Sequence, residues 1–78
     1  MEWTALPHPS FVDQLEKMRT VDGQRRWRDE NGLIYEYDGN HGGELEVYNK
    51  RGEHLGVADV HLGSIIKPAR RGRRISNV

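Results

Sequence analysis

The chain has 78 residues, whose 12 basic and 12 acidic side chains cancel, and it has no cysteine. This length allows one domain with a thin core, and the lack of cysteine excludes disulfides and thiolate metal sites. No apolar run approaches the roughly 18 residues that span a bilayer, and the first ten residues do not resemble a signal peptide. We therefore expect no membrane segment and a cytoplasmic site of action.

Charge is distributed unevenly along the chain. Residues 1–59 contain all 12 acids and 7 bases, net −5, whereas residues 60–78 contain five bases and no acid, net +5. Such a basic segment is typical of a phosphate-contacting element and equally of a frayed, solvated terminus. We expect a single domain over 1–78, with an N-terminal helical segment (1–23), a twisted sheet (24–69) and a basic tail (70–78).

The N-terminal segment has the pattern of a helix. Ser10 is a candidate N-cap with Asp13 three residues later. Three apolar residues then follow at helical spacing, namely Phe11, Leu15 and Met18. The pattern predicts a helix over 10–19 with a narrow apolar stripe.

From residue 25 onward the pattern is that of strands and tight turns. Asn31-Gly32 between apolar runs is a strong hairpin signal, and the glycine-rich run 38–43 predicts a loop. The expected strands are 25–28, 33–37, 44–48 and 53–60, with 62–66 as a fifth candidate. The fold class expected is α+β: a short N-terminal helix and one highly twisted antiparallel sheet of about four to six strands.

Alternation along two strands predicts one apolar and one polar face. Leu45 and Val47 alternate with Glu44, Glu46 and Tyr48. In the next strand the same rule points two apolar residues at the core, namely Leu55 and Val57. The sheet should therefore have one dry face and one wet face.

The wet face and the glycine loop contain the residues suited to chemistry. Asp38, His41 and Glu46 lie within nine residues and provide two carboxylates and an imidazole. RNA cleavage needs a base for the 2′-hydroxyl and an acid for the 5′-oxygen, and the nucleophile belongs to the substrate. By spacing alone the same residues also fit a solvated turn and a plain solvent face. His41, His54 and His61 lack a ligand spacing such as HExxH, so we expect no metal and no cofactor.

Three stretches resemble a known family. The runs RRWRDENGLIYEYDGNHGGELEVY, GEHLG and IKPARRGRR resemble the C-terminal cytotoxic domain of the ribosome-cleaving colicins, cloacin and related pyocins, over roughly residues 24–74. The resemblance implies a short N-terminal helix on a highly twisted antiparallel sheet. It also implies cleavage of 16S ribosomal RNA in the decoding site, which leaves a 2′,3′-cyclic phosphate and stops translation.

The resemblance also implies roles for individual residues. Glu46 would be the general base and protonated His41 the general acid, with Asp38 holding the imidazole; exchanged roles for His41 and Glu46 remain open. Arg71 and Lys67 would stabilise the phosphorane. Tyr35 would stack on or position a flipped base.

This sequence departs from the family pattern in ways that bear on the site. Gly42-Gly43 adds one residue between the histidine and the two glutamates. If the loop accommodates the added residue, Glu46 stays in the site; if it does not, the strand shifts by one register step and Glu44 takes that position. The catalytic arginine best matches Arg71, but three neighbours also fit, namely Arg70, Arg73 and Arg74. The chain is neutral whereas the relatives are strongly basic, which predicts weaker attraction to RNA.

The implied partners are the ribosome and an acidic immunity or antitoxin protein that covers the RNA-facing surface. Because the chain begins at Met1 without upstream domains, we expect either an excised toxic domain or a stand-alone toxin.

Three other functions fit the sequence. The first is a ribonuclease of the same fold that cuts transfer RNA. The second is a non-catalytic RNA-binding β module, in which four aromatic residues would serve as stacking platforms: Trp27, Tyr35, Tyr37 and Tyr48. The third is an inactive structural domain.

Overall fold

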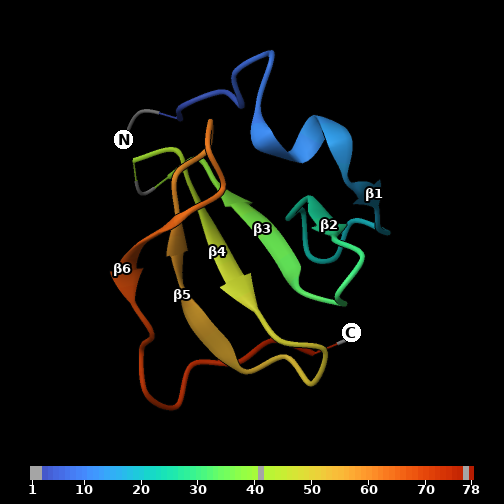
Figure 1. The fold of residues 1–78 in the computed structure, drawn as a ribbon, viewed down its shortest axis with the longest axis vertical. Coiled ribbons are helices and arrows are strands. Elements are labelled where there is room, and N and C mark those ends of the chain that lie inside the picture. Colours follow the sequence, from blue (N-terminus) through green and yellow to red (C-terminus); the bar gives the residue numbers. More distant parts are fainter. Residues whose placement is uncertain (1–2, 41, 77) are drawn as a thin grey trace.

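The computed structural model describes residues 3–40, 42–76 and 78. In this part of the chain six strands form one antiparallel sheet in the order β1-β2-β3-β4-β5-β6 (Figure 1). The strands are β1 (Glu16–Lys17), β2 (Arg26–Arg28), β3 (Ile34–Asp38), β4 (Glu44–Tyr48), β5 (His54–Ala58) and β6 (Ile65–Pro68). Each strand pairs with its sequence neighbours, so the sheet is a simple meander, and the predicted strands from residue 25 onward are confirmed to within a few residues.

The prediction of an N-terminal helix over residues 10–19 is wrong. Within the described residues the only helical element is a 3-10 turn, η1 (Phe11–Gln14), and the chain then enters β1, which pairs with β2. The fold class is therefore mostly β, and the expectation of an α+β domain with an N-terminal helix is corrected.

The local start signal for this helix is present, but it extends for only one turn. Asp13 Oδ2 accepts a hydrogen bond from the Ser10 backbone N–H at 2.8 Å, as a capping box requires. The chain is extended at Leu15 (φ −102°, ψ 162°), and the Met18 N–H then donates to Arg26 O at 2.9 Å. A ten-residue helix is marginal in water, whereas the open edge of β2 offers strand pairing.

One face of the sheet forms the apolar core beneath the N-terminal segment. Leu45 and Val47 are essentially buried there, as alternation predicted. Phe11 from the N-terminal segment packs edge-on against Tyr35, with ring centroids 5.2 Å apart. The buried cluster comprises Leu6, Val12, Trp27, Tyr35, Tyr37, Leu45, Val47 and Ala58.

The predicted facing of β5 is corrected. Leu55 is 39% exposed, and Val57 lies opposite Glu46 on the polar face. The register of the β4–β5 pair shifts between Val47 and Tyr48, so Gly56 rather than Leu55 lies opposite Val47. An irregularity of this kind inverts the alternation beyond it, and no pattern of single residues reveals it in advance.

The basic tail is docked against β5 and β2. The Ile75 N–H donates to Gly52 O at 2.9 Å, and the His54 N–H donates to Arg73 O at 3.1 Å. Further on, Arg26 Nη1 donates to Ser76 O at 2.9 Å. In Figure 1 the red C-terminal segment accordingly turns back past the start of β5. Over residues 73–76 the tail is therefore hydrogen-bonded to the rest of the domain.

Arg26 is itself held by a buried ion pair. Its Nε lies 2.8 Å from Glu36 Oε2, and both side chains are nearly excluded from solvent. Because the same guanidinium reaches the tail, this pair connects β2 and β3 to the C-terminal segment.

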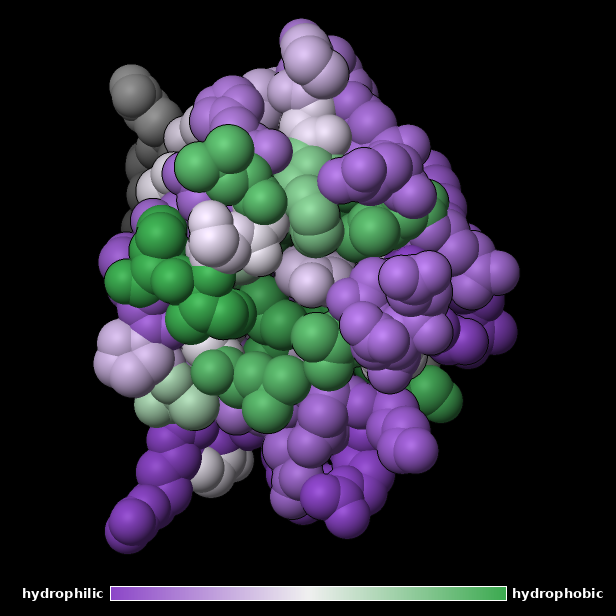
Figure 2. All heavy atoms as spheres, viewed as in Figure 1, coloured by the Kyte–Doolittle hydropathy of each residue, from purple (hydrophilic) through white to green (hydrophobic). Residues whose placement is uncertain are grey.

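Hydrophobic side chains are exposed on the side of the molecule formed by β5 and β6 (Figure 2). They are Leu55, Leu62, Ile65 and Ile66. Among the described residues, no helix has the length and apolar character needed to cross a bilayer.

Candidate active site

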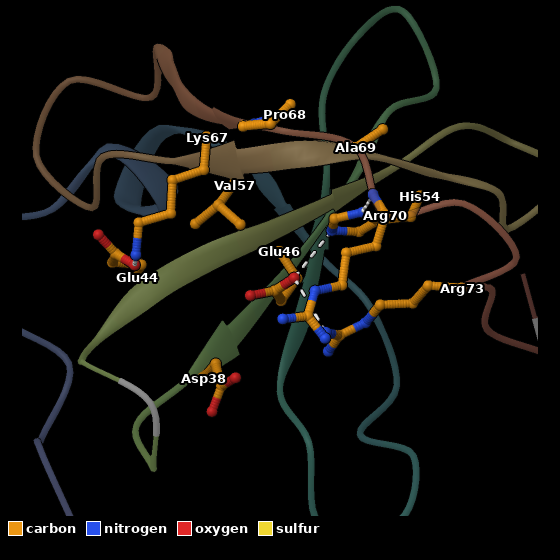
Figure 3. A pocket seen from close by; sticks show the side chains of 10 residues that line it. All are labelled: Asp38, Glu44, Glu46, His54, Val57, Lys67, Pro68, Ala69, Arg70 and Arg73. Atoms are coloured by element: carbon orange, nitrogen blue, oxygen red, sulfur yellow. Dashed lines mark hydrogen bonds and ion pairs between the residues drawn. The ribbon is translucent and has the colours of Figure 1, made fainter.

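A cleft of about 600 Å³ opens on the polar face of the sheet. Strands β3 to β6 and the start of the tail supply its walls, and Figure 3 shows the side chains that line it. Its lining residues are Asp38, Glu44, Glu46, His54, Val57, Lys67, Pro68, Ala69, Arg70 and Arg73. The cleft thus contains carboxylates, an imidazole and three cationic side chains.

Glu46 lies at the centre of this group in Figure 3. The residue is only 7% exposed, and its Oε1 lies 2.8 Å from His54 Nε2 and 3.6 Å from Arg73 Nη1. A nearly buried carboxylate needs such partners, because desolvation disfavours an unpaired charge. The structure therefore holds Glu46 between an imidazole and a guanidinium.

The loop before β4 accommodates the extra glycine. Strand β4 begins at Glu44, which lies opposite Asp38, and Gly42 and Gly43 precede it with φ of 89° and 70°. Positive φ at two successive positions suits glycine. Glu44 and Glu46 share the polar face, but Glu44 lies nearer the cleft edge, where its Oε1 pairs with Lys67 Nζ at 2.7 Å. Glu46 is the carboxylate that the structure places inside.

The structure brings two of the tail's four arginines to the cleft, namely Arg70 and Arg73. Arg71 and Arg74 do not line it, and the backbone of Arg74 forms an isolated antiparallel β-bridge with that of Glu53. The preferred candidate, Arg71, is therefore not placed at Glu46, and Arg73 occupies that position. The spacing of the tail residues did not settle this choice, because it depends on how the tail docks.

Arg73 is fixed by Tyr48 as well as by Glu46. Its Nε lies 3.2 Å from the Tyr48 hydroxyl oxygen, and donates to it. Partial burial lowers the pKa of Arg73. The hydrogen bond with Tyr48 and the charges of Glu46 and Asp38 raise it by more, so the pKa of Arg73 lies above its ordinary value. The guanidinium is thus a permanent positive charge at the cleft.

The aromatic residues expected at an RNA surface are buried instead. Tyr35 belongs to the apolar core on the opposite face from Glu46, and its hydroxyl donates to Asp29 Oδ2 at 3.2 Å. Its placement does not support stacking on a flipped base. Trp27, Tyr37 and Tyr48 are 7%, 1% and 1% exposed. The non-catalytic RNA-binding module proposed on these four rings therefore loses its platforms.

His41, the predicted general acid, lies outside the described residues. Asp38, which precedes it by three residues, is half-buried at the cleft. Among the described residues, no three His, Asp or Glu side chains gather in a way that could hold a metal ion.

His54 is the site residue that sequence reasoning missed, since it was weighed only as a metal ligand. It lies opposite Tyr48, and residues 49–53 form the turn that joins β4 to β5. The hairpin signal at 49–52 together with alternation could have placed an imidazole beside the Glu46 carboxylate. The contact itself depends on the register shift in β5.

These features define a small β domain whose basic tail lines a cleft, in which a carboxylate is bound by an imidazole and a guanidinium. The chain belongs to the Cytotoxic family, whose sequence model matches residues 7–76. The match is consistent with the cytotoxic C-terminal domain of colicin-like toxins, and the chain is a toxin domain. No curated protein matches the chain.

Proposed function

We propose that this toxin domain is a metal-independent endoribonuclease that cleaves small-subunit (16S) ribosomal RNA at the decoding site and so inhibits translation. The observation that supports it best is the position of Glu46, held in the cleft by His54 and Arg73. A fixed carboxylate next to a permanent cation suits proton abstraction beside a phosphodiester. Membership of the Cytotoxic family supports the part of the proposal that the domain is toxic.

The proposed reaction uses the RNA's own nucleophile. Glu46 takes the proton of a 2′-hydroxyl, and the 2′-oxygen attacks the adjacent phosphorus. The 5′-oxygen leaves with a proton from His41, a role assigned from the resemblance alone. The products are a 2′,3′-cyclic phosphate and a 5′-hydroxyl.

Cations at the cleft offset the charge that accumulates on the phosphorane. Arg73 lies nearest to Glu46, while Arg70 and Lys67 line the same cleft. Preorganised charges in a partly desolvated site stabilise such a transition state strongly. Because Arg73 lies beside Glu46 whereas Lys67 pairs with Glu44, we assign the principal role to Arg73. An acidic immunity or antitoxin protein covering these cations is the proposed neutralising partner.

Incubation of the purified chain with intact ribosomes tests the proposal. We expect one discrete 3′ fragment of small-subunit RNA, and no fragment with Glu46→Gln, which keeps the shape of the side chain but removes the base. Glu30→Gln, at an exposed turn, is the matched control and should cleave like the unmodified chain.

The same gel run on total RNA identifies the substrate. Shortened transfer RNA with intact ribosomal RNA would move the proposal to the transfer RNA class. Intact RNA of every kind, or full cleavage by Glu46→Gln, would contradict it.

A further inference from the structure

His54 is a buried titratable residue that the proposed reaction does not use. Its side chain is fully excluded from solvent, and both ring nitrogens have a partner. Nε2 lies 2.8 Å from Glu46 Oε1, and Nδ1 accepts a hydrogen bond from the Arg70 backbone N–H at 2.8 Å. The ring also packs edge-on against Tyr48, with centroids 5.2 Å apart.

These contacts determine which nitrogen carries the proton. A backbone N–H can only donate, so Nδ1 must accept and carries no hydrogen. The imidazole is therefore neutral with its proton on Nε2, and it donates that proton to the Glu46 carboxylate. The contacts of Glu46 with His54 and Arg73 both fall on Oε1, whereas Oε2 points away from these two residues (Figure 3). Oε2 is thus the oxygen available to the 2′-hydroxyl.

His54 also joins the carboxylate to the tail. Its ring holds the backbone of Arg70, and its own backbone N–H donates to Arg73 O at 3.1 Å. The carboxylate and the guanidinium that flank the cleft are therefore positioned through one residue of β5. A displacement of His54 moves both.

We propose that His54 is a positioning residue, which orients the Glu46 carboxylate through Nε2–H and ties that orientation to the docked tail through Nδ1. The inference rests on the proposed function, since it assigns the chemistry to Glu46. His54 itself does not touch the RNA. Misplacement of a reacting group by about 1 Å costs on the order of 100-fold in rate, which sets the size of the expected effect.

Two amide variants separate the two contacts. In His54→Asn the amide oxygen lies near the position of Nδ1 and can accept from Arg70, but the side chain does not reach Glu46. In His54→Gln the amide nitrogen lies near the position of Nε2 and can donate to Glu46. His61→Asn changes an exposed histidine and serves as the matched control.

The expected readout is a division between kcat and KM for ribosome cleavage. His54→Asn should lower kcat by on the order of 100-fold with little change in KM, because the RNA contacts remain while the base is misplaced. His54→Gln should recover at least tenfold of this loss, and His61→Asn should match the unmodified chain. A folded His54→Asn with the original kcat overturns the inference and leaves the proposed function intact. No cleavage by the unmodified chain overturns the proposed function, and this inference with it.

A spectroscopic measurement on the unmodified chain does not depend on the variants folding. Long-range ¹H–¹⁵N correlation spectra at neutral pH should show the His54 ring as the neutral tautomer with hydrogen on Nε2. A hydrogen on Nδ1, or a doubly protonated ring, would overturn the proposed orientation of Glu46 even if RNA is cleaved.

Discussion

Gly52 offers a test of whether the tail is docked as the structure shows. It has φ +85°, and a Cβ added there would lie 2.3 Å from the Ile75 carbonyl oxygen, which is backbone and cannot rotate away. Gly72 has a similar φ of +79° with nothing within 4 Å of the added Cβ. The substitutions Gly52→Ala and Gly72→Ala therefore share the left-handed backbone strain and differ only in the clash with the tail.

The strain shared by the two variants is about 1 kcal/mol. At Gly52 the clash also displaces the tail, which breaks the bonds from Ile75 N–H to Gly52 O and from His54 N–H to Arg73 O. Each such bond contributes about 1 kcal/mol net, so we expect a loss of about 3 kcal/mol for Gly52→Ala against about 1 kcal/mol for Gly72→Ala. That is a large part of the roughly 4–12 kcal/mol typical for a domain of this size.

Urea unfolding followed by tryptophan fluorescence gives the two free energies of unfolding, and ribosome cleavage gives the effect on the site. Gly52→Ala should also cleave more slowly than Gly72→Ala, because Arg73 and Arg70 move with the tail. Equal destabilisation by the two variants would refute the docked position of residues 73–76.

Three further results are expected. Arg26→Met should lower the free energy of unfolding in urea by about 3–5 kcal/mol, because it leaves the buried Glu36 carboxylate unpaired. Adding Glu36→Leu should restore most of the lost stability. An Arg26→Met variant as stable as the unmodified chain would contradict the buried pair. Arg73→Ala should slow ribosome cleavage by on the order of 100-fold, and Arg71→Ala should slow it much less. Cleavage kinetics of the two variants measure this, and a larger loss with Arg71→Ala would assign the role to Arg71 instead. Burial, with the charge of Asp29, raises the pKa of Tyr35 from 10.0 to about 12, so this tyrosine ionises first in the unfolded chain. The contribution of Tyr35 to stability is complete below pH 10 and falls by about 1.4 kcal/mol per pH unit between pH 10 and pH 12. A urea midpoint that does not move between pH 9 and pH 11 would contradict this.

Sequence reasoning located the central strands because their signals are local. Asn31-Gly32 and the turn ending at Gly52 have the residues that tight turns require, and Leu45 and Val47 alternate with polar partners. These features fixed β3 and β4 almost to the residue, and with them the polar face that contains Glu46.

Sequence reasoning failed, or left a choice open, where distant segments determine the structure. The helix expected over 10–19 has a proper start at Ser10, but pairing with β2, ten residues further on, replaces it after one turn. The choice between Arg71 and Arg73 depends on bonds from the tail to Gly52 and His54, which no local pattern encodes. The position of Tyr35 depends on which face of β3 packs into the core, and the structure places the Tyr35 ring in the core cluster.

The chemical nature of the new 3′ end tests the central claim most directly. If Glu46 activates a 2′-hydroxyl, the upstream fragment of small-subunit RNA must end in a 2′,3′-cyclic phosphate, which resists ligation until it is opened and dephosphorylated, and the downstream fragment must begin with a 5′-hydroxyl. A 3′-hydroxyl paired with a 5′-phosphate would show that water attacked the phosphorus, and would contradict the assignment of Glu46 as the base on the 2′-hydroxyl.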